Sequence, residues 1–391
     1  MMHKQTRCAT LMLTVCSLFL PFCCAQSVRV DRVERVDPNK PPISPQQIDS
    51  VLKDGSAALI KDPGKQKCGL SIWLDTKNSS IIDKRYQNIK GKNEVEALCK
   101  SNGTLNIVRS IASCSDQGEL NSTIEGCYYG SCAVVLWNDN ASLNQSLFLH
   151  EYGHIKNLKH MCGDTYLMSP VLASGEVFVT DDQCDAIKGA PKPMAACDDL
   201  GPSSIVEFVS RRYIHGIPLN KAAQFESKQL DEIRVMLSDH KSEEFWPNIV
   251  TVLGVAGDEG DDQMLIRFLK QAPDATEGAY RARLGVPIAL ARLSNKTISD
   301  KGLNYLKKGV KPEFWQKKRI RLSAYDTEED SAQQLAKTTI LSLGIVRSKK
   351  LDVQQVLKHL KAKHSKFLDD ESVQQLIDGS IQYNLSLSPV K

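Results

Sequence analysis

Hydrophobic and polar positions follow two different patterns along the chain, and the change lies near residue 200. Before it, short apolar runs bounded by Gly, Asn, Asp and Ser alternate with helical patterns, as in mixed strands and helices. The predicted strands are residues 68–74, 104–111 and 133–137. After it, long helical patterns replace the strand signals. The pattern therefore predicts an α+β domain over residues 44–200 and an all-α domain over residues 201–391.

The first helix of the α+β domain is predicted to begin at Pro45. Ser44 is a favoured N-cap residue, proline suits the first helical position, and Gln47 stands three residues after the cap. Apolar positions beginning with Ile48 would face the core. The helix is expected to continue past Leu59 and Ile60 and to end at Pro63, which is followed by glycine.

The N-terminus has the pattern of a secretory signal peptide over residues 1–25. A basic start precedes an apolar run that is too short to span a bilayer, and small residues follow it. Lipid anchoring at Cys23 is the less favoured alternative, because bulky Pro21 and Phe22 precede it. Residues 26–43 alternate valine with charged residues and end in two prolines, which predicts an exposed linker or short arm. We expect a secreted or periplasmic protein with no membrane insertion.

Cysteine use supports export. Of the twelve cysteines, eight follow the predicted signal peptide, and an even count in an exported chain predicts up to four disulfides. Cys114 and Cys127 flank a polar loop and are expected to pair. Cys162, Cys184 and Cys197 are expected to staple the segment that follows residue 160.

The helical region contains three similar stretches, which begin near Asn248, Val286 and Thr338. Each is followed by an aspartate and a second amphipathic segment. A helix pair that repeats every few dozen residues resembles a HEAT-type solenoid. The spacing is irregular, so an irregular all-α domain remains the alternative.

Composition narrows the function classes. Hydrophobic residues make up 41% and charged residues 25%, as in ordinary globular proteins. The 50 basic and 46 acidic side chains give a net charge of only +4, which argues against a nucleic-acid partner or a membrane-surface partner.

The strongest chemical signal is His150-Glu151-Tyr-Gly-His154 within a predicted helix. Residues four apart project from one helix face, so both imidazoles can reach one metal ion. Glu151 lies about 100° around the helix, which places its carboxylate beside the ion. It can therefore accept a proton from water at the metal.

A third ligand follows six residues after the second. His160 can reach the same ion only if the helix ends abruptly, and Asn157 is suited to the left-handed conformation that would end it. Three histidine nitrogens leave one position open, which is the arrangement of a catalytic zinc ion. Met168 stands in a turn that could lie beneath the imidazoles. The histidines of the helical region, His215, His240, His359 and His364, are expected to be surface residues.

This combination resembles the metzincin clan of zinc endopeptidases, and its matrixin-type branch most, with Asn157 where the family usually has glycine. The resemblance implies a zincin-like fold, one catalytic zinc ion on His150, His154 and His160, and support from Met168; structural calcium stays open. It also implies that Pro170 lines the pocket for the side chain after the scissile bond. The edge strand that pairs with the substrate would be Ala133, Val134, Val135, Leu136 and Trp137. Cys68-Gly69 resembles an inhibitory matrixin propeptide motif, although a disulfide is the preferred interpretation.

The sequence thus predicts a secreted zinc endopeptidase in which Glu151 is the general acid and base. The alternative is an exported, non-catalytic binding protein with a structural zinc ion, in which the helical repeats bind the partner. Substrates would be proteins or peptides. Residues 201–391 would either dock a protein partner or merely brace the catalytic domain.

Overall fold

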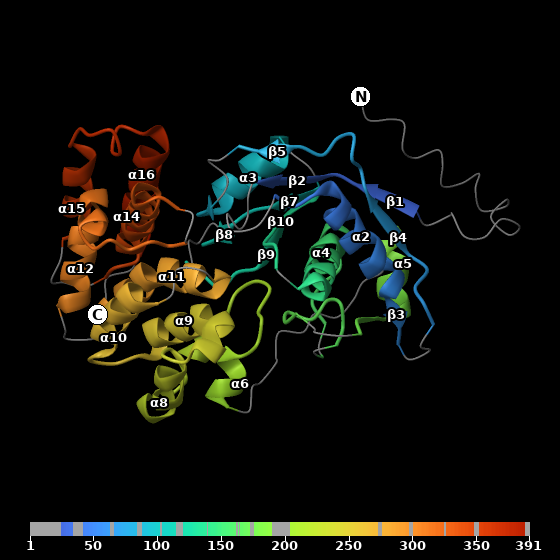
Figure 1. Cartoon of the computed structure of the whole chain (residues 1–391), viewed down its shortest axis with the longest axis horizontal. Coiled ribbons are helices and arrows are strands. Elements are labelled where there is room, and N and C mark those ends of the chain that lie inside the picture. The colour runs from blue at the N-terminus through green and yellow to red at the C-terminus, as the bar shows by residue number, and fades with distance from the viewer. Residues whose placement is uncertain are drawn as a thin grey trace, which may run out of the picture.

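A computed structural model describes most of the chain (Figure 1). The described residues are 25–33, 42–62, 66–83, 88–101, 104–114, 120–138, 140–161, 163, 165–172, 176–189, 204–272, 276–296, 300–323, 326–347 and 352–387. The predicted signal peptide, apart from its last residue, lies outside this set. The predicted boundary at residue 200 does so too.

The N-terminal half is built around a five-stranded sheet with the order β5-β2-β7-β10-β9. Its strands are β5 (Ile81–Ile82), β2 (Val30–Val33), β7 (Leu105–Ile107), β10 (Cys132–Val135) and β9 (Gly126–Tyr129). The first four are mutually parallel, and β9 runs antiparallel to β10 at the edge. An antiparallel strand at the edge of a parallel sheet is a common arrangement.

The beginning of the described chain is not an exposed arm, as the sequence had suggested. Strand β1 (Ala25–Val28) pairs with β4 (Ser71–Leu74), and β2 lies inside the main sheet. Val28 and Val30 are buried. Valine alternating with charged residues is therefore the period-2 pattern of half-buried strands. The N-terminal domain starts before residue 44.

Helices and two smaller sheets complete this half. The helices are α2 (Pro45–Ala58), α3 (Lys92–Ser101), α4 (Ala141–Ile155) and α5 (Asp181–Ile187). The smaller sheets pair β3 (Ile60–Lys61) with β11 (Phe178–Val179) and β6 (Asn88–Ile89) with β8 (Ser110–Ile111). The capping box predicted for α2 is confirmed, because Ser44 and Gln47 each bond the other's backbone N–H. Helix α2 packs against α4. It ends at Ala58 and not at Pro63 as expected, because Leu59 leaves the helical conformation and Ile60–Lys61 pair with β11.

Three disulfides are present in the described part of the chain: Cys68–Cys184, Cys99–Cys132 and Cys114–Cys127. The predicted 114–127 pair is confirmed. The disulfide preferred for Cys68 is confirmed as well, which leaves it no free thiolate to cap a metal. The expectation for Cys184 was wrong, because it ties α5 back to the segment before β4. Cys162 and Cys197 lie outside the described residues.

The C-terminal half is helical. Its elements are α6 (Ile205–Val209), α7 (Leu219–Ala222), α8 (Ser227–Met236), the 3-10 helix η2 (His240–Phe245), α9 (Trp246–Ala256), α10 (Asp261–Gln271), α11 (Glu277–Ser294), α12 (Lys301–Gly309), α13 (Pro312–Gln316), α14 (Glu328–Gly344), α15 (Val353–Lys361) and α16 (Glu371–Ser386). Helices α9, α11, α14 and α16 pack side by side in this order. The three similar sequence stretches lie in α9, α11 and α14, and α10, α12 and α15 follow them. Among the described residues, no helix is long and apolar enough to cross a bilayer.

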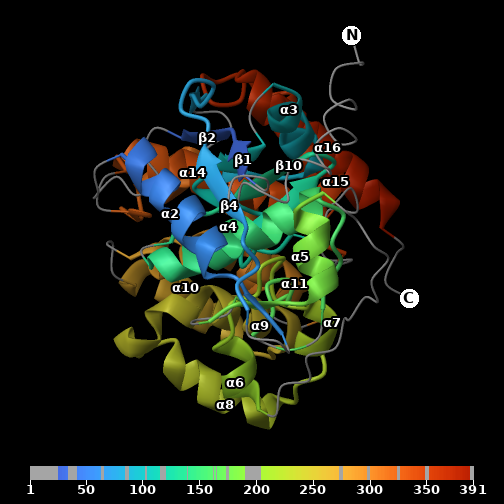
Figure 2. The same ribbon diagram turned by 90° about the vertical axis from the view of Figure 1, so that its right-hand side faces the viewer.

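The two halves contact each other along a buried interface (Figures 1 and 2). Arg109, which follows β7, makes a bidentate ion pair with Asp326, with N–O distances of 2.8 and 3.0 Å. Arg281 of α11 pairs with Glu125, just before β9, at 2.9 Å. All four side chains are buried. Buried charges that lose their partner are strongly destabilising, so these pairs fix how the halves dock.

The Arg109–Asp326 pair predicts a large stability effect. Replacing Arg109 by Met leaves the Asp326 carboxylate buried without its partner, which should lower the free energy of unfolding by about 3 kcal/mol in urea titrations. The matched control is Lys361→Met, which removes an exposed pair with Asp378 and should change stability by less than about 1 kcal/mol. Equal effects of the two substitutions would contradict this view of the interface.

Candidate metal centre

Helix α4 carries the first two ligands through the interior of the N-terminal half. Asn140 caps it by accepting a hydrogen bond from the Ser142 backbone N–H at 2.9 Å. Most positions from Leu143 to His154 are buried, as expected for a helix enclosed on all sides. His150 and His154 lie one turn apart and project together from one face, as predicted.

The end of α4 returns the chain toward the same point. Asn157 adopts the left-handed conformation, with φ of 65°, which the sequence had predicted for this position. The Leu158 N–H then bonds to the Gly153 carbonyl oxygen at 3.0 Å. This turn redirects the backbone, so that the His160 ring faces His154.

Four histidines converge, rather than the three expected. The ligand atoms of His150, His154, His160 and His215 all lie within 4.8 Å of one another. The His154 Nε2 atom lies 3.0 Å from that of His150, 3.1 Å from that of His160 and 3.2 Å from that of His215. The His150 and His215 Nε2 atoms are 3.4 Å apart.

Three of these rings are oriented by backbone carbonyl oxygens at their other nitrogen. The Nδ1 contacts are Leu167 O at 2.7 Å for His150, Leu158 O at 2.8 Å for His154 and Gly126 O at 3.0 Å for His215. A carbonyl can only accept a hydrogen bond, so each Nδ1 carries the proton and each Nε2 presents a lone pair. Carbonyl partners of this kind orient metal-binding histidines and fix their tautomer.

This donor set fits a metal ion. Converging Nε2 lone pairs repel one another unless a cation lies between them. Zn–N bonds of 2.0–2.1 Å imply nitrogens about 3.3 Å apart around a tetrahedral ion, close to the spacing found here. Burial and the neighbouring imidazoles hold the pKa of His150 well below its usual value, and burial lowers that of His154 to about 4. Both rings are therefore neutral at pH 7, as metal binding requires.

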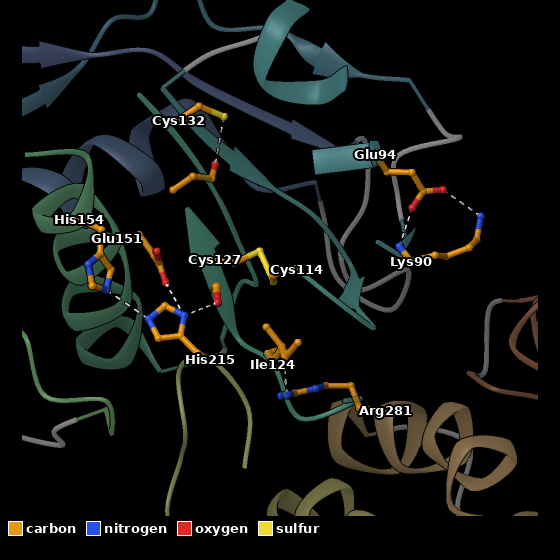
Figure 3. The surroundings of a disulfide bond; sticks show 12 residues. Lys90, Glu94, Cys114, Ile124, Cys127, Cys132, Glu151, His154, His215 and Arg281 are labelled. Carbon is orange, nitrogen blue, oxygen red and sulfur yellow. Dashed lines mark hydrogen bonds and ion pairs between the residues drawn. A yellow bond between two sulfur atoms is a disulfide. The ribbon is translucent and has the colours of Figure 1, made fainter. Parts of the chain in front are cut away.

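His215 was wrongly expected at the surface. It lies between α6 and α7 in the helical half, and its ring stands between His154 and Glu151 (Figure 3). The sequence gives little sign of this role, because His215 is 55 residues from His160 and belongs to no spaced motif. The apolar pair Tyr213-Ile214 before it, buried in the structure, is the one local hint that this segment is not exposed. His240 and His364 are at the surface, as expected.

Glu151 stands beside the cluster in an unusual environment. Its side chain is fully buried, and neither carboxylate oxygen has a hydrogen-bond partner among the described residues. Its Oε1 lies 3.8 Å from His215 Nδ1. Burial raises the pKa of this carboxyl group well above its usual range. A side chain at Gly126 would overlap the carboxylate, so this glycine makes room for it.

Met168 is fully buried against helix α4. A side chain at Gly153 would collide with the Met168 sulfur. The backbone of the same turn orients a histidine of the cluster, since the Leu167 carbonyl oxygen accepts from His150. Gly153 and Met168 therefore pack together on the helix that carries His150 and His154.

The strand expected to bind substrate is not the edge strand. Residues Ala133, Val134 and Val135 lie in β10, which is covered on one side by β7 and on the other by β9, and Leu136 is buried behind them. Trp137 is partly buried and packs against Phe148. The edge strand is β9. Its Tyr128 is exposed and stacks on the His154 ring, with centroids 4.4 Å apart. The sequence placed the hydrophobic run correctly in a strand, but a fully apolar run indicates an interior strand.

The chain was compared with known protein families, with curated proteins and with solved structures, and none of the three comparisons finds a match. The chemistry of the site therefore has to be argued from its own residues.

The four-histidine centre predicts tight, stoichiometric metal binding. One Zn²⁺ per chain should bind, and zinc at a hundredfold excess over its dissociation constant should raise the free energy of unfolding by about 2.7 kcal/mol. His154→Ala should abolish this gain, whereas His240→Ala, at an exposed histidine, should retain it. Metal analysis and thermal unfolding with and without a chelator test the prediction. Unchanged binding by His154→Ala would contradict it.

The raised pKa of Glu151 predicts a pH-dependent stability of the metal-free protein. The folded state holds this proton more tightly than the unfolded state, whose carboxyl group titrates near about 4.3. Unfolding therefore releases a proton above that pH, and stability falls as pH rises toward the folded pKa. Glu151→Gln removes this fall, so its melting temperature should exceed that of the wild type by a margin that grows from pH 4.5 to pH 8. Exposed Glu313→Gln is the control, and a constant margin would refute the prediction.

Proposed function

We propose that the protein is a secreted zinc-dependent endopeptidase of the metzincin type. The observation that carries the proposal is the buried carboxylate of Glu151 next to the converging histidines, which has no hydrogen-bond partner among the described residues. Burying a carboxylate without a partner is costly, and a purely structural metal site has no need of it. A catalytic acid and base does need it.

Each residue then has a part in peptide hydrolysis. His150, His154 and His160 would hold the ion, and Met168 supports them from below. Bound zinc would supply Lewis acidity, which polarises the scissile carbonyl and makes water a better nucleophile. Glu151 accepts a proton from the attacking water and delivers it to the leaving amine as the C–N bond breaks. A carboxyl pKa raised by burial suits both transfers near neutral pH.

The surroundings of the site support a peptide substrate. Strand β9 lies at the sheet edge beside the ligand helix, which is the position from which an extended peptide can be bound by strand addition. The polypeptide after Met168, including Pro170, faces it across the centre: Ile214 bonds to both, at Gly126 and at Pro170. The proposal includes a zincin-like fold for the N-terminal half and HEAT-like helical repeats for the C-terminal half.

Export is supported by the three disulfides, which persist in oxidising compartments.

The role of residues 201–391 is proposed to be bracing as well as docking. Buried ion pairs join this half to residues next to β7 and β9. Removing residues 201–391 would leave Arg109 and Glu125 without these ion-pair partners. Truncation is therefore a poor test of docking, and substitutions on exposed helix faces are better.

A second candidate function has one observation in its favour. His215 gives the centre a fourth nitrogen, and four protein ligands are typical of structural zinc sites. In that case the protein would be an exported binding protein whose helical half carries the binding surface. The two candidates differ in what they require of Glu151.

Substitution of Glu151 separates them. Glu151→Gln should lower kcat/KM for peptide-library substrates by about 10²–10⁴-fold, because the acid and base is lost while the zinc ligands remain. Zinc content and folding should be unchanged, which metal analysis and circular dichroism check. Glu313→Gln serves as the surface control. Equal cleavage by the wild type and Glu151→Gln, or no cleavage under any condition, would favour the second candidate.

A further inference from the structure

Residues 212–215 cross from the helical half into the metal centre. They lie between α6 and α7, both of which pack in the helical core. Ile214, however, is buried in the hydrophobic core of the N-terminal half. In return, Val171 from the turn after Met168 is buried in the helical core. The segment is therefore inserted into the other half rather than resting on its surface.

The backbone of this segment is bonded on both sides. On one side, the Ile214 carbonyl oxygen accepts from the Glu125 and Gly126 N–H groups at 2.8 and 3.0 Å, at the start of edge strand β9. On the other side, the Ile214 N–H donates to the Pro170 carbonyl oxygen at 3.0 Å.

The bonding on the Pro170 side continues along the chain. The Leu172 N–H donates to the Arg212 carbonyl oxygen at 2.9 Å, and Tyr213 forms an antiparallel bridge with Val171. The segment is thus held between the start of edge strand β9 and residues 170–172, with one bridge at Tyr213 and a turn over residues 213–216 in which the Gly216 N–H donates to the Tyr213 carbonyl oxygen at 3.4 Å. Its contacts with Glu125 and Gly126 occupy backbone N–H groups that a peptide added to β9 could otherwise bind.

His215 completes this arrangement at the metal centre. Its Nε2 atom converges with those of His150 and His154, at 3.4 and 3.2 Å. A catalytic zinc site keeps one position open for water or substrate, and a fourth histidine closes it. His215 is also the ligand on a loop between short helices, and 28% of its side chain is exposed, whereas His150 is fully buried on α4. His160 is likewise partly exposed and outside a helix, but it follows α4 directly, so only the departure of His215 leaves the three-histidine set of the N-terminal half intact.

We propose that residues 212–215 are a built-in inhibitory segment, which occupies the space between the start of β9 and residues 170–172 and closes the metal centre with His215, so that activity requires the segment to be displaced. The proposal rests on the proposed peptidase function, and it accounts for the coexistence of a buried acid and base with a fourth ligand. Arg212 anchors the segment, because its side chain donates hydrogen bonds to Asn138 at 3.0 Å and to Glu244 at 2.9 Å.

The test measures access to the centre rather than catalysis. The probe is a fluorescent peptide hydroxamate, an extended peptide that ends in a zinc-chelating group, titrated into the zinc-loaded full-length protein. His215→Ala should bind it at least tenfold more tightly than the wild type, and the control His240→Ala should match the wild type. In the cobalt-substituted protein, the hydroxamate should change the visible absorption spectrum of His215→Ala and leave that of the wild type unchanged.

A second variant tests the same idea in case His215→Ala no longer retains the metal ion. Arg212→Ala keeps all four histidines and loosens the segment. It also removes an ion pair of Arg212 with Glu125 at 3.6 Å, but Glu125 retains Arg281 as its partner at 2.9 Å. This variant should bind the hydroxamate several-fold more tightly than the wild type. If the wild type and both variants bind the probe equally, the proposal of an inhibitory segment is refuted.

The double variant His215→Ala, Glu151→Gln distinguishes this failure from failure of the proposed function. Hydroxamate binding does not need the acid and base, so the double variant should still bind the probe tightly. Peptide cleavage should rise at least tenfold in His215→Ala and disappear in the double variant. Tight probe binding by His215→Ala without any cleavage would support the inhibitory segment and refute the proposed peptidase function. Weak probe binding by His215→Ala together with strong cleavage by the wild type would refute the inhibitory segment alone.

Discussion

The convergence of imidazole lone pairs is the constraint on which the rest of the centre depends. The Nε2 atoms approach one another to 3.0–3.4 Å, and those of His150, His154 and His215 carry lone pairs that repel one another until a cation is bound. The fold therefore has to hold the rings from behind, and carbonyl oxygens from three different segments do so. It also has to keep space free, and glycines at 126 and 153 leave room for the Glu151 carboxylate and the Met168 sulfur. The histidines on α4, Glu151 and Met168 are therefore packed together around these two glycines.

The two halves are bound by reciprocal burial rather than by a smooth contact surface. Each half contributes apolar side chains to the core of the other, and two buried arginine–carboxylate pairs lie at the same junction. Buried pairs of this kind specify geometry more than they add stability. Here the specified geometry is the approach of the segment with His215 to α4.

Local signals in the sequence were enough to predict the helix ligands and the turn after them. Helical spacing places His150 and His154 on one face. The turn follows from the tolerance of Asn157 for positive φ, and the Ser44 capping box follows from short-range hydrogen bonds. The disulfide between Cys114 and Cys127 spans a single loop and was also predicted. These features depend on residues within about a dozen positions of each other, where backbone geometry restricts the possibilities.

What could not be predicted depends on pairing across long separations. The valine-rich segment before residue 34 has a strand pattern, but its partners lie in β4, β5 and β7. Ala133 and its neighbours form a strand, yet only the complete sheet order shows that β9 covers them. His215 is brought to the centre by docking of the halves, which no local spacing encodes.

Because three nitrogens come from one half and the fourth from the other, a single ion would fasten the two halves together. The free energy of metal binding would then include part of the free energy of docking, and the coupling is reciprocal. A pulling force or a ligand that separates the halves would weaken metal retention. Loading with metal would, to the same extent, resist their separation, so a bound ion would also cross-link the two halves.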